Sequence, residues 1–100
     1  MKNLLEIQNN VLVPNAEALM IEEFNVIWKR DKTKLKEKAL KELAYIYHTC
    51  DYQSIYRNYH PDIQNKKIFE DIFGDGSTWK PDLRVKDAQE KYRKLQTTLS

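Results

Sequence analysis

Hydrophobic and polar residues alternate at the start of the chain. The apolar positions of this alternation are Leu5, Ile7, Val11 and Val13. Asn9-Asn10 lies between them, and asparagine tolerates the positive φ of a tight turn. The pattern predicts an extended segment over residues 1–14, as a short hairpin or a single bent arm. Because an isolated two-stranded hairpin is barely stable in water, we expect it either to pack on the rest of the chain or to pair with a sheet in a partner.

The spacing of apolar residues changes to three and four after Pro14-Asn15, where Asn15 can cap a helix. One face of that helix would carry Ala16, Leu19, Met20, Phe24, Ile27 and Trp28. Asp31 can cap a second helix that ends near residues 48–51 and has the wide apolar stripe of a buried face. That stripe consists of Leu35, Ala39, Leu40, Leu43, Ala44, Ile46 and Tyr47.

Three further helices are predicted in the second half of the chain. Tyr52, Tyr56 and Tyr59 are spaced as on one side of a short helix, which His60-Pro61-Asp62 ends. An apolar helix then runs from Ile63 to Gly74, and a turn over 74–78 follows it. The last helix begins at Pro81 or Asp82. Its apolar seam is Val85, Ala88, Tyr92, Leu95 and Leu99.

These elements predict a mainly α fold, a small bundle of four to five helices with a short extended N-terminal arm or hairpin. The chain has 100 residues, which is the size of one domain. Its two glycines and three prolines disfavour a turn-rich all-β fold. We therefore divide the chain into an extended arm, residues 1–14, and a helical domain, residues 15–100.

Charge is distributed unevenly along the chain. Residues 28–41 hold seven basic and two acidic residues, whereas residues 1–28 hold one basic and four acidic residues. A small protein with an acidic end and a basic ridge is suited to contact nucleic acid or another copy of itself. The lysines that we expect to meet acidic protein surface or DNA are Lys32, Lys34, Lys36, Lys38 and Lys41.

No residue pattern in the chain is typical of an active site, a cofactor site or a metal site. His48, Cys50, Asp51 and His60 are metal-like residue types, but their spacing is not that of a zinc site. A single cysteine excludes an intrachain disulfide. No apolar run approaches the roughly 20 residues of a membrane-spanning helix. We expect a soluble, cytoplasmically made protein that is not an enzyme, needs no cofactor and does not bind membranes.

Aromatic residues are the remaining candidates for contacts with a partner. Tyrosine and tryptophan are enriched in protein interfaces and also fill cores with their polar atoms kept hydrogen-bonded. We expect each of the following to be a core or interface anchor: Trp28, Tyr45, Tyr47, Tyr56, Tyr59 and Trp79. Of these, Tyr56, Tyr59 and Trp79 are predicted to contact a partner.

The order of these features resembles a family of small virion proteins of tailed bacteriophages. The matching segments are Pro14 with the helix after it, residues 27–32, 38–47 and 51–56, and Trp79-Lys80-Pro81-Asp82. The chain departs from that pattern at Ile55, where relatives often have proline, and at residues 64–67, which lack an expected arginine. A much shorter match, Tyr59 with His60-Pro61-Asp62, resembles the tripeptide of J-domain co-chaperones.

The virion resemblance implies a non-enzymatic structural role at the capsid, portal or head-to-tail connector. The partners would be other virion proteins and copies of the same chain in a ring or lattice, with non-specific contact to packaged DNA. The protein would reside in the virion after assembly in the host cytoplasm. The alternative from the residues themselves is a small helical DNA-binding regulator that uses the lysine ridge, residues 29–41.

Overall fold

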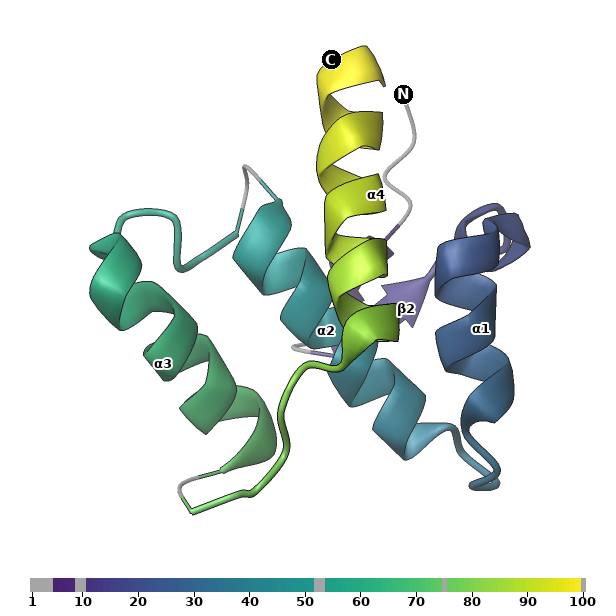
Figure 1. Ribbon diagram of the computed structural model, residues 1–100, viewed down its shortest axis with the longest axis horizontal. Coiled ribbons are helices and arrows are strands. Elements are labelled where there is room, and N and C mark those ends of the chain that lie inside the picture. The colour runs from purple at the N-terminus through teal and green to yellow at the C-terminus, as the bar shows by residue number, and fades with distance from the viewer. Residues whose placement is uncertain (1–4, 9–10, 52–53, 75, 100) are drawn as a thin grey trace.

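Four α-helices and a two-stranded hairpin form the described part of the computed structural model, residues 5–8, 11–51, 54–74 and 76–99 (Figure 1). In chain order the elements are β1 (Leu5–Gln8), β2 (Val11–Pro14), the 3-10 turn η1 (Ala18–Met20), α1 (Glu22–Arg30), α2 (Glu37–Cys50), α3 (Pro61–Phe73) and α4 (Leu83–Leu99). Helix α2 packs against α1, α3, α4 and β2, and α4 also packs against α1. The mainly helical fold with a short extended N-terminal segment is confirmed.

The N-terminal hairpin packs on the helices of its own chain. Leu5 is fully buried and Leu12 nearly so, and both belong to the same core cluster as the helices. The antiparallel register pairs Leu5 with Pro14 and Glu6 with Val13, so odd positions of β1 share a face with even positions of β2. Val13 is accordingly 40% exposed. The prediction that Val13 lies on the same face as Leu5 was therefore wrong, because Leu12 is the β2 residue that packs into the core. Asn9-Asn10 lies outside the described residues.

The first long helix begins later than predicted. The side chain of Asn15 accepts a hydrogen bond from the Glu17 N–H at 2.8 Å and forms a local turn before η1. Ile21 has an extended backbone with ψ of 125° and separates η1 from α1. The predicted face over residues 16–20 is therefore wrong: Ala18 is buried and Met20 is exposed. The later part of that face is confirmed, because the buried residues of α1 are Phe24 and Ile27.

Residues 31–36 form a loop and not the first turns of a helix. Asp31 nevertheless caps α2 across this loop, because its carboxylate accepts hydrogen bonds from the Ala39 N–H at 2.7 Å and the Thr33 N–H at 2.8 Å. Lys36 has a left-handed backbone with φ of 55°, and its Nζ donates to the carbonyl oxygens of Trp28 at 3.0 Å and Asp31 at 2.7 Å. Lys36 thus stabilises the loop, and the predicted lysine ridge is not one helix face.

Asp31→Asn should destabilise the fold in a pH-dependent way. Burial alone would raise the pKa of Asp31, but the hydrogen bonds from Ala39 and Thr33 lower it to about 2, below the ordinary aspartate value of about 3.9. A lowered folded-state pKa contributes stability above the unfolded pKa, and this stability is lost as pH falls toward the folded pKa. The difference in Tm between wild type and variant should therefore be full at pH 7 and shrink from about pH 4 toward pH 2.

Thermal unfolding followed by circular dichroism across this pH range checks the prediction. Asp62→Asn, at an exposed carboxylate in the first turn of α3, is the control and should leave Tm nearly unchanged. A wild-type-to-variant difference that stayed constant down to pH 2 would contradict the capping role of Asp31.

The segment that holds the tyrosines is a series of turns, and the predicted short helix over Tyr56 and Tyr59 is wrong. Tyr52 lies outside the described residues. The end of α3 and the start of α4 were predicted well, whereas α3 begins two residues before the predicted Ile63. Helix α3 starts at Pro61 with His60 as its cap and ends at Gly74, which has a φ of 90° that favours glycine. The carboxylate of Asp82 accepts the Val85 N–H at 3.0 Å and caps α4, as predicted.

Helix α4 closes the core against α1 and α2. Val85, Ala88 and Tyr92 are buried along the predicted seam, and Leu95 packs partly buried against the same core. The ring of Tyr92 meets the ring of Phe24 edge-on at a centroid distance of 6.3 Å. None of the helices in the described ranges combines the length and apolar character that crossing a bilayer requires.

Candidate interaction surfaces

A polar junction joins α1, α2 and the connection that leads into α4. Arg30 donates from Nη2 to Glu42 Oε2 at 2.8 Å and from Nη1 to Asp82 Oδ2 at 2.6 Å. Trp79 Nε1 donates to the same Glu42 oxygen at 3.2 Å. Burial opposes the charged forms, but the pairing outweighs it, so that the pKa of Arg30 is raised and that of Asp82 is lowered. Both carboxylates of the junction, Glu42 and Asp82, are therefore hydrogen-bonded, and we call this junction the structural clamp because it links α1, α2 and the connection to α4.

Trp79 contributes to the packing of this junction. Its ring stacks on Phe73 at 4.0 Å and meets Tyr45 edge-on at 5.0 Å. A hollow of about 290 Å³ lies beside it, with the exposed Lys38 and Lys80 among its lining residues. The indole is thus partly buried against the chain's own core, and only its remaining surface is free for a partner.

The buried polar side chains near α2 also serve the fold. The Tyr56 hydroxyl donates to Asp71 at 2.6 Å, and burial together with this bond raises the pKa of Tyr56 to about 12. The Tyr92 hydroxyl donates to Asp51 in the same manner. Burial raises the pKa of the Cys50 thiol and so disfavours its nucleophilic form. Within the described ranges, no group of His, Cys, Asp and Glu is arranged to hold a metal ion.

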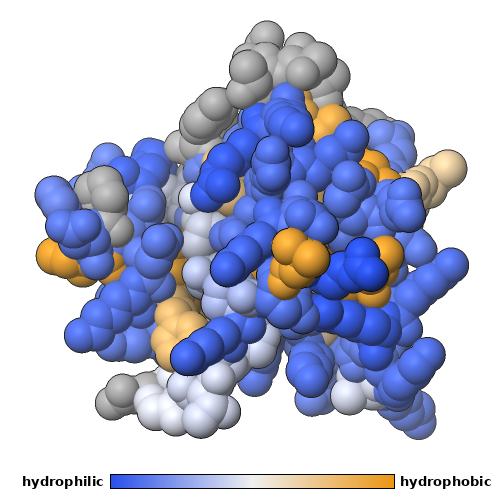
Figure 2. Space-filling view, in the orientation of Figure 1, coloured by the Kyte–Doolittle hydropathy of each residue, from blue (hydrophilic) through white to orange (hydrophobic). Residues whose placement is uncertain are grey.

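An apolar patch lies where the α2–α3 connection enters α3. Ile55, Tyr59 and Ile63, which we call the 55–63 patch, are between 46% and 71% exposed. Local hydrogen bonds fix the turn beneath it: the Ser54 hydroxyl accepts the Tyr56 N–H at 3.2 Å, and Gln64 Nε2 donates to the Tyr56 carbonyl at 2.8 Å. Figure 2 shows hydrophobic surface on the same edge of the molecule as α3 in Figure 1.

A basic surface lies at the other side of the bundle, on the loop before α2 and on α2 itself. It consists of Lys32, Lys34, Lys38 and Lys41, which are all exposed. No ion pair engages any of these four among the residues that the structure describes. Leu35, which was predicted to be part of the buried stripe, is 69% exposed between these lysines. The surface therefore combines free cations with one accessible apolar side chain.

The residues predicted to contact a partner fall into three groups. Leu5 and Tyr56 are buried in the chain's own core, and Lys36 and Trp79 are half-buried, for the reasons given above. The exposed ones are Val13, Lys32, Lys34, Lys38, Lys41 and Tyr59. Ile7 and Val11 lie in the paired strands, and their side chains lie outside the described part of the chain. The structure thus brings together the lysines on one side and Tyr59 with two isoleucines on another.

The sequence pattern did not indicate Ile55 and Ile63 as surface residues, nor Arg30, Glu42 and Asp82 as a cluster. The spacing of four between Ile55, Tyr59 and Ile63 predicts a common face only in a helix, and residues 54–60 are turns, so this spacing did not reveal the patch. The junction had no local signal either, because Arg30 and Asp82 are 52 positions apart.

Comparisons with known proteins find no match: no family model fits the chain, and no curated protein or solved structure is significantly similar to it.

Proposed function

We propose that this chain is a non-enzymatic structural component of a tailed-bacteriophage particle, in the head, portal or head-to-tail connector region. It would act through protein–protein contacts with other virion proteins and with its own copies in a ring or lattice. The observation that supports the contact role is the 55–63 patch. The assignment to a phage particle rests on the resemblance of the sequence pattern to small virion proteins.

The patch has the chemistry of a contact surface. Ile55 and Tyr59 lie in turns that hydrogen bonds hold in place, and Ile63 lies in the first turn of α3 beside them in sequence. A rigid apolar group on a polar surface loses little conformational entropy when it binds, and aromatic and aliphatic anchors of this kind dominate interface energies. The hairpin offers a second candidate contact surface, because the outer edge of a strand can pair with a strand from a partner.

The test is the mass of the purified chain by sedimentation equilibrium over a concentration series. Ile55→Ser/Ile63→Ser should weaken association, and the contact made through the patch should persist in high salt because apolar burial is not screened. Met20→Ser, at an exposed apolar residue of η1, is the matched control and should associate as the wild type does. Association that is equal in all three proteins would contradict the role of the patch.

The second candidate is a DNA-binding regulator, and the free lysines 32, 34, 38 and 41 favour it. Lysines that neutralise phosphates give an affinity that falls steeply with salt, because counterions are released on binding. Adding duplex DNA to the sedimentation series distinguishes the two functions. A chain that moves onto DNA at low salt, leaves it at high salt and loses this affinity in Lys34→Glu/Lys38→Glu would support the regulator instead.

A further inference from the structure

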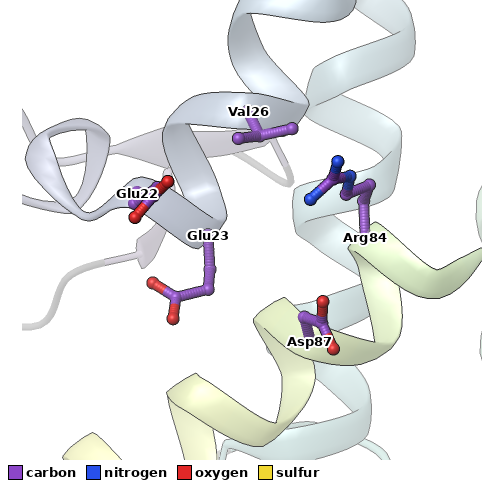
Figure 3. Close-up of a pocket in the computed structure, with 5 residues that line it drawn as sticks. All are labelled: Glu22, Glu23, Val26, Arg84 and Asp87. Atoms are coloured by element: carbon purple, nitrogen blue, oxygen red, sulfur yellow. The ribbon is translucent and has the colours of Figure 1, made fainter.

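A second surface with a defined shape lies between α1 and α4. A hollow of about 180 Å³ is lined by Glu22, Glu23, Val26, Arg84 and Asp87. Figure 3 shows Glu23 and Val26 on α1 across from Arg84 and Asp87 on α4, with Arg84 reaching toward Val26 and the carboxylate of Glu23 turned away from α4. We call this surface the acidic hollow. It has three carboxylates, one guanidinium and one aliphatic side chain.

The carboxylates of the acidic hollow form no salt bridge among the described residues, and Lys91 and Lys94 line the adjoining hollow with Glu23 and Asp87. Arg84 forms no ion pair within the described ranges either. These carboxylates are not arranged to share a metal ion either. An apolar residue with a surplus of free carboxylates around it is instead complementary to an apolar side chain flanked by cations.

The loop before α2 presents that complement. Leu35 is 69% exposed, and Lys32 and Lys34 are exposed beside it in sequence. We call residues 32–35 the basic loop. Asp31 and Lys36 hold the ends of this loop through the hydrogen bonds described above, so its shape is set before any partner binds.

Within one copy, the basic loop is not among the residues that line the acidic hollow. Glu22 and Glu23 are in the first turn of α1, and the basic loop follows its last residue, Arg30. At a rise of about 1.5 Å per residue, Arg30 lies roughly 12 Å along α1 from Glu22 and roughly 6 Å from Val26. In Figure 1 the loop between α1 and α2 lies at the lower right, at the far end of α1 from η1.

We propose that the basic loop of one copy docks into the acidic hollow of the next copy, head to tail. Leu35 would contact Val26, and Lys32 and Lys34 would pair with Glu22, Glu23 and Asp87. This inference rests on the proposed assembly function and names one of its partners. Because the two contacting surfaces differ, the contact is heterologous, so association continues past the dimer until a ring closes or a filament forms.

Charge reversal with complementation tests this contact on the whole chain. Lys34→Glu and Glu23→Lys should each weaken association roughly tenfold or more, because each places like charges across the contact. An equimolar mixture of the two variants should associate again, since the reversed loop fits the reversed hollow. Lys66→Glu, an equal charge change at an exposed position of α3, is the control and should associate as the wild type does.

Leu35→Ser adds a test that leaves the charge unchanged, and it should also weaken association. Each variant is first checked for native helix content by circular dichroism. Sedimentation at low and high salt then gives the oligomer size, and the head-to-tail contact should fall with salt. A wild-type chain that stays monomeric at millimolar concentration, a mixture that fails to restore association, or a Lys66→Glu variant as weak as Lys34→Glu would overturn the proposal.

Comparing the patch variant with the charge-reversal variants distinguishes failure of the head-to-tail contact from failure of the proposed assembly function. If Ile55→Ser/Ile63→Ser abolishes association and Lys34→Glu leaves it intact, the assembly role stands and the head-to-tail contact is wrong. If the reversed variants complement one another, assembly and its head-to-tail geometry are supported together.

Discussion

Leu12→Ala is expected to lower the free energy of unfolding by about 2–5 kcal/mol, whereas Val13→Ala should change it by less than about 0.5 kcal/mol. The two residues are neighbours in β2 and lie on opposite faces of the hairpin. Leu12 is almost fully buried in the core cluster, and Val13 is exposed. Removing the buried side chain leaves a cavity against the helices, while the space left by the Val13 side chain is open to solvent.

Chemical denaturation followed by circular dichroism at 222 nm measures both effects. The difference between the two variants should be easy to measure. A domain of this size has a free energy of unfolding of only about 5–15 kcal/mol, so Leu12→Ala alone removes a large fraction of it. Two equally small effects would show that residues 1–14 behave as a separable arm. A large effect at Leu12 alone would show that the hairpin is part of the domain and that removing it to probe assembly would also unfold the bundle.

The helices in the second half of the chain could be predicted because their boundaries are set locally. Gly74 ends α3 within one residue of its last turn, and Asp82 caps α4 through a contact three residues away. Such short-range contacts can be predicted directly from the sequence. The buried seam of α4 followed in the same way from the spacing of Val85, Ala88 and Tyr92.

The errors lie where longer-range contacts decide the backbone. Leu35 continues the apolar spacing of α2 and so predicted a helix over residues 31–36. Instead, the Asp31 carboxylate accepts a hydrogen bond from the Ala39 N–H, eight residues ahead, and Lys36 Nζ donates to the Trp28 carbonyl. These bonds stabilise a loop that pattern alone cannot predict. The hairpin shows a different limit: each strand was recognised, but the face of β2 depends on the register across the turn.

The candidate surfaces were only partly predictable for a related reason. The exposure of Lys32, Lys34, Lys38 and Lys41 follows from their charge. The acidic hollow depends on Glu23 and Asp87, which are far apart in the sequence and meet only because α4 packs on α1. A charge count identified the acidic and basic segments but could not show that each has an apolar residue at its centre.

Glu42→Gln should lower the free energy of unfolding by about 1.5–3 kcal/mol, and Asp82→Asn by less than about 1 kcal/mol. Both carboxylates pair with Arg30, but the Glu42 side chain is 5% exposed and the Asp82 side chain is 52% exposed. Solvent screens the exposed pair, whereas the buried pair loses a charge-assisted bond that water cannot replace. Asparagine is also an effective helix cap, so Asp82→Asn keeps the start of α4.

Fluorescence of Trp79 provides a local readout for the same pair of variants. In a Trp28→Phe background Trp79 is the only indole, and its Nε1–H is bonded to Glu42. Glu42→Gln weakens that acceptor at its charged oxygen, so the emission of Trp79 should shift in the folded state, while Asp82→Asn should leave it unchanged. Equal losses of stability in the two variants would contradict the clamp, because Arg30 would then hold α1 through its exposed partner as firmly as through its buried one.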